Sequence, residues 1–302
     1  MTVSHTSGGV KMDSEKCTIL MSILKNGSMS AAAQELNYTQ SGISRAIEAM
    51  EKSAGFQIIT RGRGGVCLTH EGEALLPAIR EIAYWAEQYE QTVQRLNGAE
   101  TGRLAVGSSY AKYFPWLTKV ISGFHEKHPG ITVELCSGTS TELARRMSAK
   151  SLDFGIISRR EGTFQSTVVK KDQLVAMLPP EHPMAHSASV PVSIFEREPY
   201  IEIHTGLQTD NSICFSSRGI VPNLSFSTPD SVIACGMVKA GLGVALVNGV
   251  IADELSGGVA YVPLNPPENV DICVISPARE VISPAAKSFA TYAMEYISEL
   301  DF

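Results

Sequence analysis

The first seventy residues constrain the fold of this chain most, because three short helix patterns follow one another there in close succession. Each pattern begins at a residue that can cap a helix and ends at a short polar or glycine-containing turn, and the three cover residues 14–25, 29–36 and 40–53. Ser28 and Thr39 are the predicted caps of the second and third helices. Three helices joined this tightly predict a helix-turn-helix.

The third of these helices has two different faces. Ile43, Ile47 and Met50 are spaced for burial, whereas the opposite face is polar. In a helix-turn-helix the N-terminal end of such a helix enters the major groove, where hydroxyl, amide and guanidinium groups reach base edges or phosphates. An amphipathic helix with a solvated face is the alternative interpretation. The candidate DNA-binding residues of the helical part are Ser28, Thr39, Gln40, Ser41, Ser44 and Arg45.

A hairpin pattern follows the third helix directly. Strand patterns over 56–60 and 66–68 flank the turn Arg61-Gly62-Arg63-Gly64-Gly65. Glycines allow the backbone to approach DNA phosphates closely, and Arg61 and Arg63 bring positive charge to them. After a helix-turn-helix, this hairpin indicates a winged helix, and its two arginines join the candidate DNA contacts.

The positive charge of this region is small and local. The chain as a whole has a net charge of −6. Between Thr39 and Thr69 only Arg45, Lys52, Arg61 and Arg63 stand against Glu48 and Glu51. Because so few cations bind DNA weakly, we expect two or more copies of the chain to bind together.

Residues 71–97 predict one long helix with a heptad repeat. Its apolar positions recur in alternating steps of four and three residues, at Leu75, Ile79, Ile82, Ala86, Tyr89, Val93 and Leu96. The rest of the helix is polar, which favours a dimerising coiled coil over a helix packed on its own domain. Residues 97–102 are a natural hinge.

Beyond Gly102 strand and helix patterns alternate, which predicts an α/β domain with a parallel sheet. The first set of strands covers 104–107, 131–136 and 153–157, with helices over 113–128 and 142–149. A second set begins near Gln165, and its strand patterns cover 174–178, 200–204, 224–226 and 244–247. A strand over 270–275 and a helix over 284–300 close the chain. We expect two lobes joined by crossovers near 158–164 and 265–269.

A ligand site is expected between these lobes, at the ends of strands and the beginnings of helices. Backbone N–H groups there favour anions and carboxylates. Arg159, at the first crossover, could pair with a carboxylate. For each residue, a role as a helix cap or turn residue is the alternative. The candidates are Ser108, Ser109, Thr139, Ser140, Arg159, His204, Thr205 and Thr228.

The run NGSMSAAAQELNYTQSGISRAIEAMEKSAGFQIITRGRGGVCLTHEGEALLP resembles the LysR-type transcriptional regulators. The resemblance rests on a capping Ser, paired Ala, a Leu, an S-x-x-S-R-x-I helix, a wing Arg and L-T-x-x-G, which are here Ser28, Ala32-Ala33, Leu36, Ser41 to Ile47, Arg61, and Leu68-Thr69 to Gly72. Met50 and Ile59 stand where the family usually has Leu and Phe. Both are apolar exchanges, so they concern packing rather than function.

The remainder of the chain resembles the same family's effector domain, through GRLAVGSS, FHEKHPGITVEL, SLDFGII, PPEHP and VKAGLGVAL. The resemblance implies a dimerising linker helix and a two-lobed effector domain similar in fold to periplasmic binding proteins. The predicted organisation is a flexible tail (1–12), a winged helix-turn-helix DNA-binding domain (13–70), a dimerising linker helix (71–98) and an α/β effector-binding domain (102–302). Lobe I is predicted to take 102–163 and 268–302, and lobe II 164–267.

The predicted function is control of transcription by sequence-specific DNA binding, in response to an anionic small-molecule effector. The expected partners are double-stranded DNA, that effector and further copies of the chain. A homodimer through the linker helix is expected, with further assembly into a homotetramer as the expected larger form and RNA polymerase as an additional candidate partner. No cofactor and no membrane contact are expected, and the expected location is the cytoplasm.

Other classes of protein fit the sequence less well. It has no GxSxG, no P-loop and no GxGxxG after a strand, and the HxxH formed by His125 and His128 lacks further zinc ligands, so neither a catalytic nor a metal site is expected. The apolar segment 232–251 is broken by glycines and predicts a helix and a strand rather than a membrane span. A solute-binding protein would not need the DNA-binding pattern or lack a signal peptide. The same regulator switched by oxidation of Cys214 or Cys235 stays open.

Overall fold

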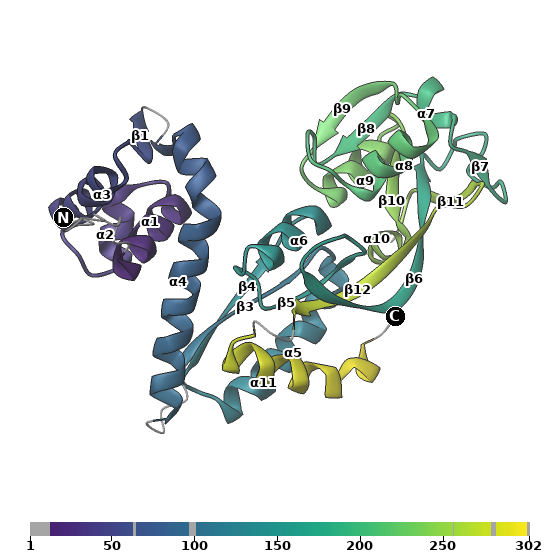
Figure 1. The fold of residues 1–302 in the computed structure, drawn as a ribbon. Helices are drawn as coiled ribbons and strands as arrows, with labels where there is room; N and C mark the ends of the chain where they lie inside the picture. The colour runs from purple at the N-terminus through teal and green to yellow at the C-terminus, as the bar shows by residue number, and fades with distance from the viewer. Residues whose placement is uncertain (1–12, 63–64, 97–100, 256, 279–281, 301–302) are drawn as a thin grey trace, which may run out of the picture. The chain divides into compact units, whose positions relative to one another are not determined.

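The structure is a computed structural model that describes residues 13–62, 65–96, 101–255, 257–278 and 282–300. The chain divides into two compact units, residues 1–99 and residues 100–302 (Figure 1). The predicted tail 1–12 lies outside the described residues, as does Arg63.

The N-terminal unit begins with three helices whose ends follow the sequence signals. They are α1 (Ser14–Asn26), α2 (Met29–Glu35) and α3 (Gln40–Ala54). Thr39 Oγ1 accepts a hydrogen bond from the backbone N–H of Gly42 at 3.0 Å, so the predicted cap of α3 is confirmed. Gly27 and Gly55 end α1 and α3 with φ of 64° and 85°, a conformation that favours glycine.

The hairpin that follows is displaced from its predicted place. Its strands are β1 (Ile59–Gly62) and β2 (Gly65–Leu68), paired antiparallel with Ile59 opposite Leu68 and Arg61 opposite Val66. Arg61 is therefore a strand residue and not a turn residue. The prediction began the first strand at Phe56, but Glu51 Oε1 accepts from the N–H groups of Ile58 and Ile59 at 2.8 and 3.1 Å, so a side chain holds this part of the backbone.

The apolar heptad residues of helix α4 (His70–Leu96) differ in burial between its two halves. In its first half Ile79 is fully buried and Leu75 and Ile82 are partly buried, all against the core of α1 to α3. In its second half Tyr89 is 71% exposed. The sequence interpretation, which assigned the whole repeat to a dimer, was wrong for the first half, because those apolar residues complete the core of their own unit.

The C-terminal unit is built on one mixed sheet in the order β4-β3-β5-β12-β6-β11-β7, with β10 also paired to β6. Three strands are parallel, as predicted: β3 (Gly102–Ser108), β4 (Ile131–Ser137) and β5 (Phe154–Ser158). However, β12 (Asn269–Pro277) is antiparallel to both β5 and β6 (Phe164–Leu178). The predicted parallel sheet is therefore a mixed one, because β6 leads out of the first lobe and β12 leads back, so these two strands run in opposite directions.

Strand β6 belongs to both lobes. Its first part pairs with β12, up to Gln173 opposite Asn269, and its last five residues pair with β10 (Ala245–Asn248) and β11 (Ala260–Asn265). The first crossover, predicted near 158–164, therefore continues along strand β6, which begins at Phe164. The short β7 (Val190–Pro191) completes this sheet, and β8 (Tyr200–Ile203) and β9 (Leu224–Thr228) form a separate parallel pair.

Helices cover both faces of the first lobe's strands (Figure 1). On one face lie η1 (Ala111–Tyr113), α5 (Phe114–Lys127), α11 (Pro284–Glu295) and η3 (Ile297–Glu299), and on the other α6 (Ser140–Ser148). Leu104 and Val106 of β3 pack in the core beneath α5 and α11, whereas Ala105 packs in the core beneath α6. Successive side chains of a strand point to opposite faces of the sheet, so this alternation is expected.

The described residues of the second lobe form the helices α7 (Ile194–Arg197), α8 (Asp210–Arg218), α9 (Ser231–Lys239) and α10 (Gly249–Glu254). Of these, the sequence predicted only α9. The apolar segment 232–251 forms α9 and β10, as predicted. Among the described residues, no helix combines the length and the apolarity that crossing a membrane would need.

Candidate DNA-binding surface and inter-lobe site

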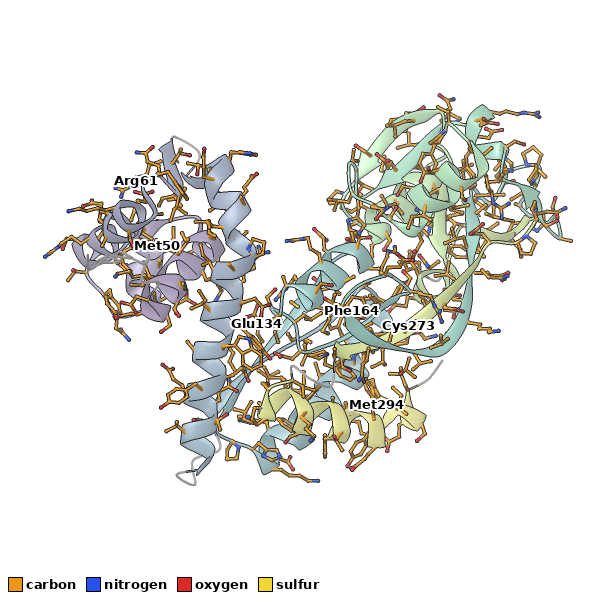
Figure 2. All side chains as sticks on the ribbon, in the orientation of Figure 1. Met50, Arg61, Glu134, Phe164, Cys273 and Met294 are labelled. Atoms are coloured by element: carbon orange, nitrogen blue, oxygen red, sulfur yellow. The ribbon has the colours of Figure 1, made fainter. Side chains whose placement is uncertain are left out.

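The polar face of α3 is open, and most of its predicted DNA-binding residues lie on it. Gln40, Ser41 and Arg45 are exposed, and together with Ser44 and Glu48 they line a shallow depression. Arg45 Nε donates to the carbonyl of Ser41 at 3.4 Å, which leaves most of the guanidinium available. Arg61 lies at the outer edge of the N-terminal unit, whereas Met50 lies among its helices (Figure 2).

Two predicted residues have structural contacts as well. Ser28 is half-buried and its Oγ accepts from Ala31 N at 3.4 Å, so it caps α2. Thr39 caps α3, and its Oγ1 lies 3.1 Å from Ser41 Oγ. The residue that the predicted contact set left out is Glu48, whose Oε1 accepts from Ser44 Oγ at 3.0 Å and brings negative charge to this face.

The carboxylate of Glu35 in α2 fixes this helix against α1. Glu35 Oε1 accepts from Lys25 Nζ at 2.8 Å, and its Oε2 accepts from Ser22 Oγ at 2.7 Å and from Asn26 Nδ2 at 2.6 Å. These hydrogen bonds, from Lys25 first and then Ser22, lower the pKa of Glu35 to about 2. No local sequence signal reveals this contact, because its donors lie 9 to 13 residues away.

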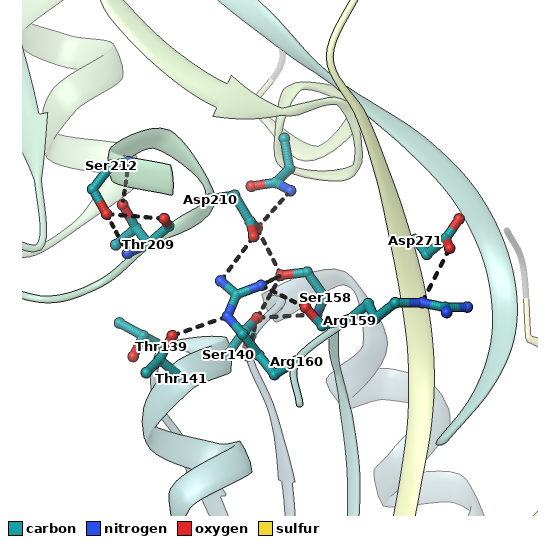
Figure 3. Close-up of polar contacts among 12 residues, drawn as sticks. Thr139, Ser140, Thr141, Ser158, Arg159, Arg160, Thr209, Asp210, Ser212 and Asp271 are labelled. Atoms are coloured by element: carbon teal, nitrogen blue, oxygen red, sulfur yellow. Dashed lines mark hydrogen bonds and ion pairs between the residues drawn. The ribbon is translucent and has the colours of Figure 1, made fainter. Parts of the chain in front are cut away.

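In the C-terminal unit, one polar network joins the two lobes (Figure 3). Asp210, the first residue of α8, stands at its centre. Asp210 Oδ1 lies 2.8 Å from Arg160 Nη2, and its Oδ2 accepts from Ser158 Oγ at 2.6 Å and from Asn248 Nδ2 at 3.0 Å. Ser140 Oγ lies 2.7 Å from Ser158 Oγ. We call Ser140, Ser158, Arg160, Asp210 and Asn248 the inter-lobe network.

Two of the predicted effector contacts lie in or next to this network. Ser140 belongs to it, and Ser109 Oγ is 3.1 Å from Ser140 Oγ. Tyr110 also touches it, because Asn248 Nδ2 donates to the Tyr110 hydroxyl at 3.3 Å. Burial, and then the charge of Asp210, raise the pKa of Tyr110 well above its usual value, so the phenol stays protonated.

The other predicted effector contacts lie outside the network. Ser108 and Thr228 make turn bonds with Tyr110 and Asp230, and Thr139 forms a capping box with Glu142. Arg159 points away, with its Nε 3.2 Å from Asp271 Oδ2 (Figure 3). His204, at φ 61°, and Thr205 lie in the turn after β8.

Sequence reasoning missed four of the five network residues. Arg160 is a cation at the first crossover just as Arg159 is, so the sequence does not distinguish them. Only the fold decides which of the two points toward Asp210. Asp210 follows Thr209, whose side chain forms a capping box with Ser212, so the start of α8 was detectable as a helix cap. Ser158 and Asn248 are each the last residue of a strand. Ligand contacts were expected at strand ends, but these two residues were not among the candidates.

The part of the chain that the structure describes contains no group of three or more His, Cys, Asp or Glu placed to hold a metal ion. Of the two candidate redox cysteines, Cys214 is buried and Cys235 is half-buried. Burial raises the pKa of Cys214 to about 11, which disfavours its reactive thiolate.

Comparison with known proteins decides the family. Residues 15–73 match the bacterial regulatory helix-turn-helix protein model of the lysR family, and residues 97–298 match the LysR substrate binding domain. This chain belongs to the LysR family of transcriptional regulators. LysR-type regulators are not enzymes, and the two matches correspond to a DNA-binding domain and an effector-binding domain.

The chain is similar to LysR-family proteins over nearly its whole length. It is 28% identical to the uncharacterized HTH-type transcriptional regulator YvbU of Bacillus subtilis, over 92% of this chain and 96% of that protein. Among solved structures, a full-length OxyR variant from Pseudomonas aeruginosa has a TM-score of 0.68 at 17% identity, covering 95% of each chain. Full-length CbnR complexed with its target DNA has a TM-score of 0.55 at 18% identity, covering 94% of this chain and 99% of that one. These structural likenesses show the fold.

Proposed function

We propose that this LysR-family chain binds specific operator sequences as a homo-oligomer and that a small anionic effector bound between its two lobes controls it. The observation that supports DNA recognition best is the exposed polar face of α3, with Gln40, Ser41 and Arg45 at its N-terminal half. The proposed DNA contacts are those of the sequence analysis: Ser28, Thr39, Gln40, Ser41, Ser44, Arg45, Arg61 and Arg63.

The second half of α4 supports assembly. Trp85, Tyr89 and Val93 are exposed apolar residues spaced four apart, so they lie along one face of the helix. A second α4 packed there would form the proposed homodimer, and further contacts would form the tetramer. Two DNA-binding units would then bind two half-sites. Because the proposed target is chromosomal DNA, the proposal includes a cytoplasmic location and leaves RNA polymerase as a candidate partner.

The inter-lobe network supports the effector site. It gathers hydroxyl, amide and guanidinium donors from both lobes, and these are groups that bind carboxylates. Ser109 and Ser140 therefore remain proposed effector contacts beside this network. Ser108, Thr139, Arg159, His204, Thr205 and Thr228 remain candidate effector contacts outside the network.

A fluorescence anisotropy titration tests the DNA-binding part of this function. The full chain is titrated against the DNA upstream of its own gene, with excess competitor DNA, at several salt concentrations. The proposal predicts salt-sensitive binding that survives the competitor, and loss of that binding in Arg45→Ala. Binding that the competitor abolishes at every salt concentration would contradict recognition of that sequence.

A further inference from the structure

The inter-lobe network holds a carboxylate at its centre, and that carboxylate belongs to the chain itself. Asp210 takes hydrogen bonds from Ser158 and Asn248 and pairs with Arg160. The side chains of Arg160 and Asp210 are each only 11% exposed, so both charges are largely removed from water. Such a set of donors is what a site for a ligand carboxylate would contain.

The donors are held in place by contacts other than Asp210. Arg160 Nε donates to Thr141 Oγ1 at 2.9 Å, and its Nη1 donates to the carbonyl of Arg159 at 2.8 Å. Ser158 is fixed through its backbone N–H, which donates to Ser140 Oγ at 3.0 Å. If Asp210 moved away, these groups would keep their positions and would have lost their acceptor, a costly state for buried donors.

Charge decides what can occupy the position. While Asp210 is in place it neutralises Arg160, and a second anion beside it would be repelled. Without Asp210, the same position offers one positive charge with hydroxyl and amide donors. An anion and Asp210 are therefore alternatives at this position.

Helix α8 connects this position to the junction between the lobes. At its first residue is Asp210, and at its last is Arg218, whose Nη2 lies 2.6 Å from Glu268 Oε2. Arg218 also donates to the carbonyls of Pro266 and Pro267, in the turn that leads into β12. The residues before Asp210, from Thr205 to Gln208, are exposed, whereas Asn211 donates from Nδ2 to the carbonyl of Leu246 at 2.7 Å and so holds α8 to β10 of the second lobe.

We propose that Asp210 is a built-in competitor of the effector: in the ligand-free chain its carboxylate occupies the anion position, and an effector carboxylate binds Arg160, Ser158 and Asn248 by displacing it. This inference rests on the anionic effector of the proposed function. Displacement releases the N-terminal end of α8 from the first lobe, and Arg218 passes the change to the turn before β12.

Chemical rescue tests this in the full chain. Asp210→Ala leaves a space the size of a carboxylate beside Arg160, and acetate is the probe. Thermal unfolding is followed against acetate concentration, with chloride at equal ionic strength and with neutral acetamide. We expect acetate, and not acetamide, to raise the Tm of Asp210→Ala saturably, with an apparent Kd about tenfold or more below that of the wild type.

Three further variants complete the experiment. Asp210→Asn, which keeps the size of the side chain, should also bind acetate more tightly than the wild type and serves if Asp210→Ala fails to fold. Asp210→Ala combined with Arg160→Met should lose the rescue. Asp230→Ala is the matched control, because that aspartate also stands at a helix start but accepts from the backbone N–H groups of Val232 and Ile233.

Equal acetate responses in wild type, Asp210→Ala and Asp210→Asn would overturn the proposal, as would rescue that persists without Arg160. The DNA titration of the same preparations distinguishes this failure from failure of the proposed function. If the variants bind DNA specifically but show no rescue by acetate, the proposed regulatory function is retained and the proposal that Asp210 competes with the effector is rejected.

Discussion

Arg61 of strand β1 donates from Nη2 to Ser44 Oγ of helix α3 at 3.1 Å. The strand that leads to the wing is therefore joined to the recognition helix by a side-chain contact. Ser44 in turn donates to Glu48 at 3.0 Å, so a cation, a hydroxyl and a carboxylate lie in a row across this face. A DNA phosphate that approached Arg61 would compete with this arrangement.

Removing Arg61 should weaken DNA binding without unfolding the protein. Its guanidinium is exposed, so Arg61→Ala loses a charge and no core contact. The slope of log K against log salt should fall by about one for a lost phosphate contact. Anisotropy titrations at several salt concentrations measure the slope, and Arg197→Ala, an exposed arginine of the C-terminal unit, is the control. An unchanged slope would exclude Arg61 as a phosphate contact.

Removing the negative charge of Glu48 should have the opposite effect. Glu48→Gln keeps an oxygen that can accept from Ser44 and removes repulsion between the carboxylate and the phosphates. We expect affinity for DNA to rise roughly two- to fivefold at low salt, with the gain shrinking as salt screens the charge. The same titrations measure it, and a loss of affinity would mean that Glu48 itself contacts the DNA, as an acceptor from a cytosine amino group.

The Glu35 contact predicts a particular dependence of stability on pH. The pKa of Glu35 is lowered from 4.5 to about 2 in the folded chain, so its stabilising effect is present above about pH 4.5 and is lost as the pH falls toward 2. Glu35→Gln should therefore melt at a lower temperature than the wild type at pH 6. The difference in Tm should narrow as the pH falls below 4.5. A difference that stays constant down to pH 3 would contradict the lowered pKa.

Two helical glycines should respond to alanine in opposite ways. A Cβ on Gly72, in the first turn of α4, would overlap the carbonyl oxygen of Ile58, whereas a Cβ on Gly236 in α9 meets nothing within 4 Å. Gly72→Ala should destabilise the chain by about 2 kcal/mol or more, because backbone must move. Gly236→Ala should be neutral or stabilise by up to about 1 kcal/mol. Urea unfolding measures both, and equal effects would argue against the close packing at Gly72.

The exposed face of α4 predicts how the oligomer can be broken. Tyr89→Asp places a charge in the proposed helix–helix contact, and we expect the dimer to dissociate at least tenfold more readily. Sedimentation velocity measures the association, and Glu90→Ala, next along the helix, is the control. If Tyr89→Asp assembles like the wild type, the second half of α4 is not the dimer contact.

The sequence predicted best what short-range interactions determine. Thr39 was correctly predicted as the cap of α3, because the cap is set by a neighbouring backbone group, and Gly55 ends the same helix in an equally local way. The heptad repeat was predicted correctly as a pattern, but its partner depends on tertiary structure. Ile79 packs on its own unit, and no period in the sequence distinguishes that from packing on a second chain.

The candidate effector site was harder to predict, because its members come from four separate segments. Ser140 was found as a residue at a helix start. Asp210 was not, because the start of α8 lies beside Arg160 only after both lobes have folded. The choice between Arg159 and Arg160 likewise depends on where Asp271 and Asp210 lie.

Selection from fragmented genomic DNA tests the central claim most directly. The purified full chain is mixed with the fragments at near-physiological salt, and the bound fragments are sequenced, in parallel with Arg45→Ala. The account predicts enrichment of a small set of sites that share two related half-sites, and loss of that set with Arg45→Ala. Enrichment of no shared sequence, or the same set from both proteins, would contradict sequence-specific recognition by α3.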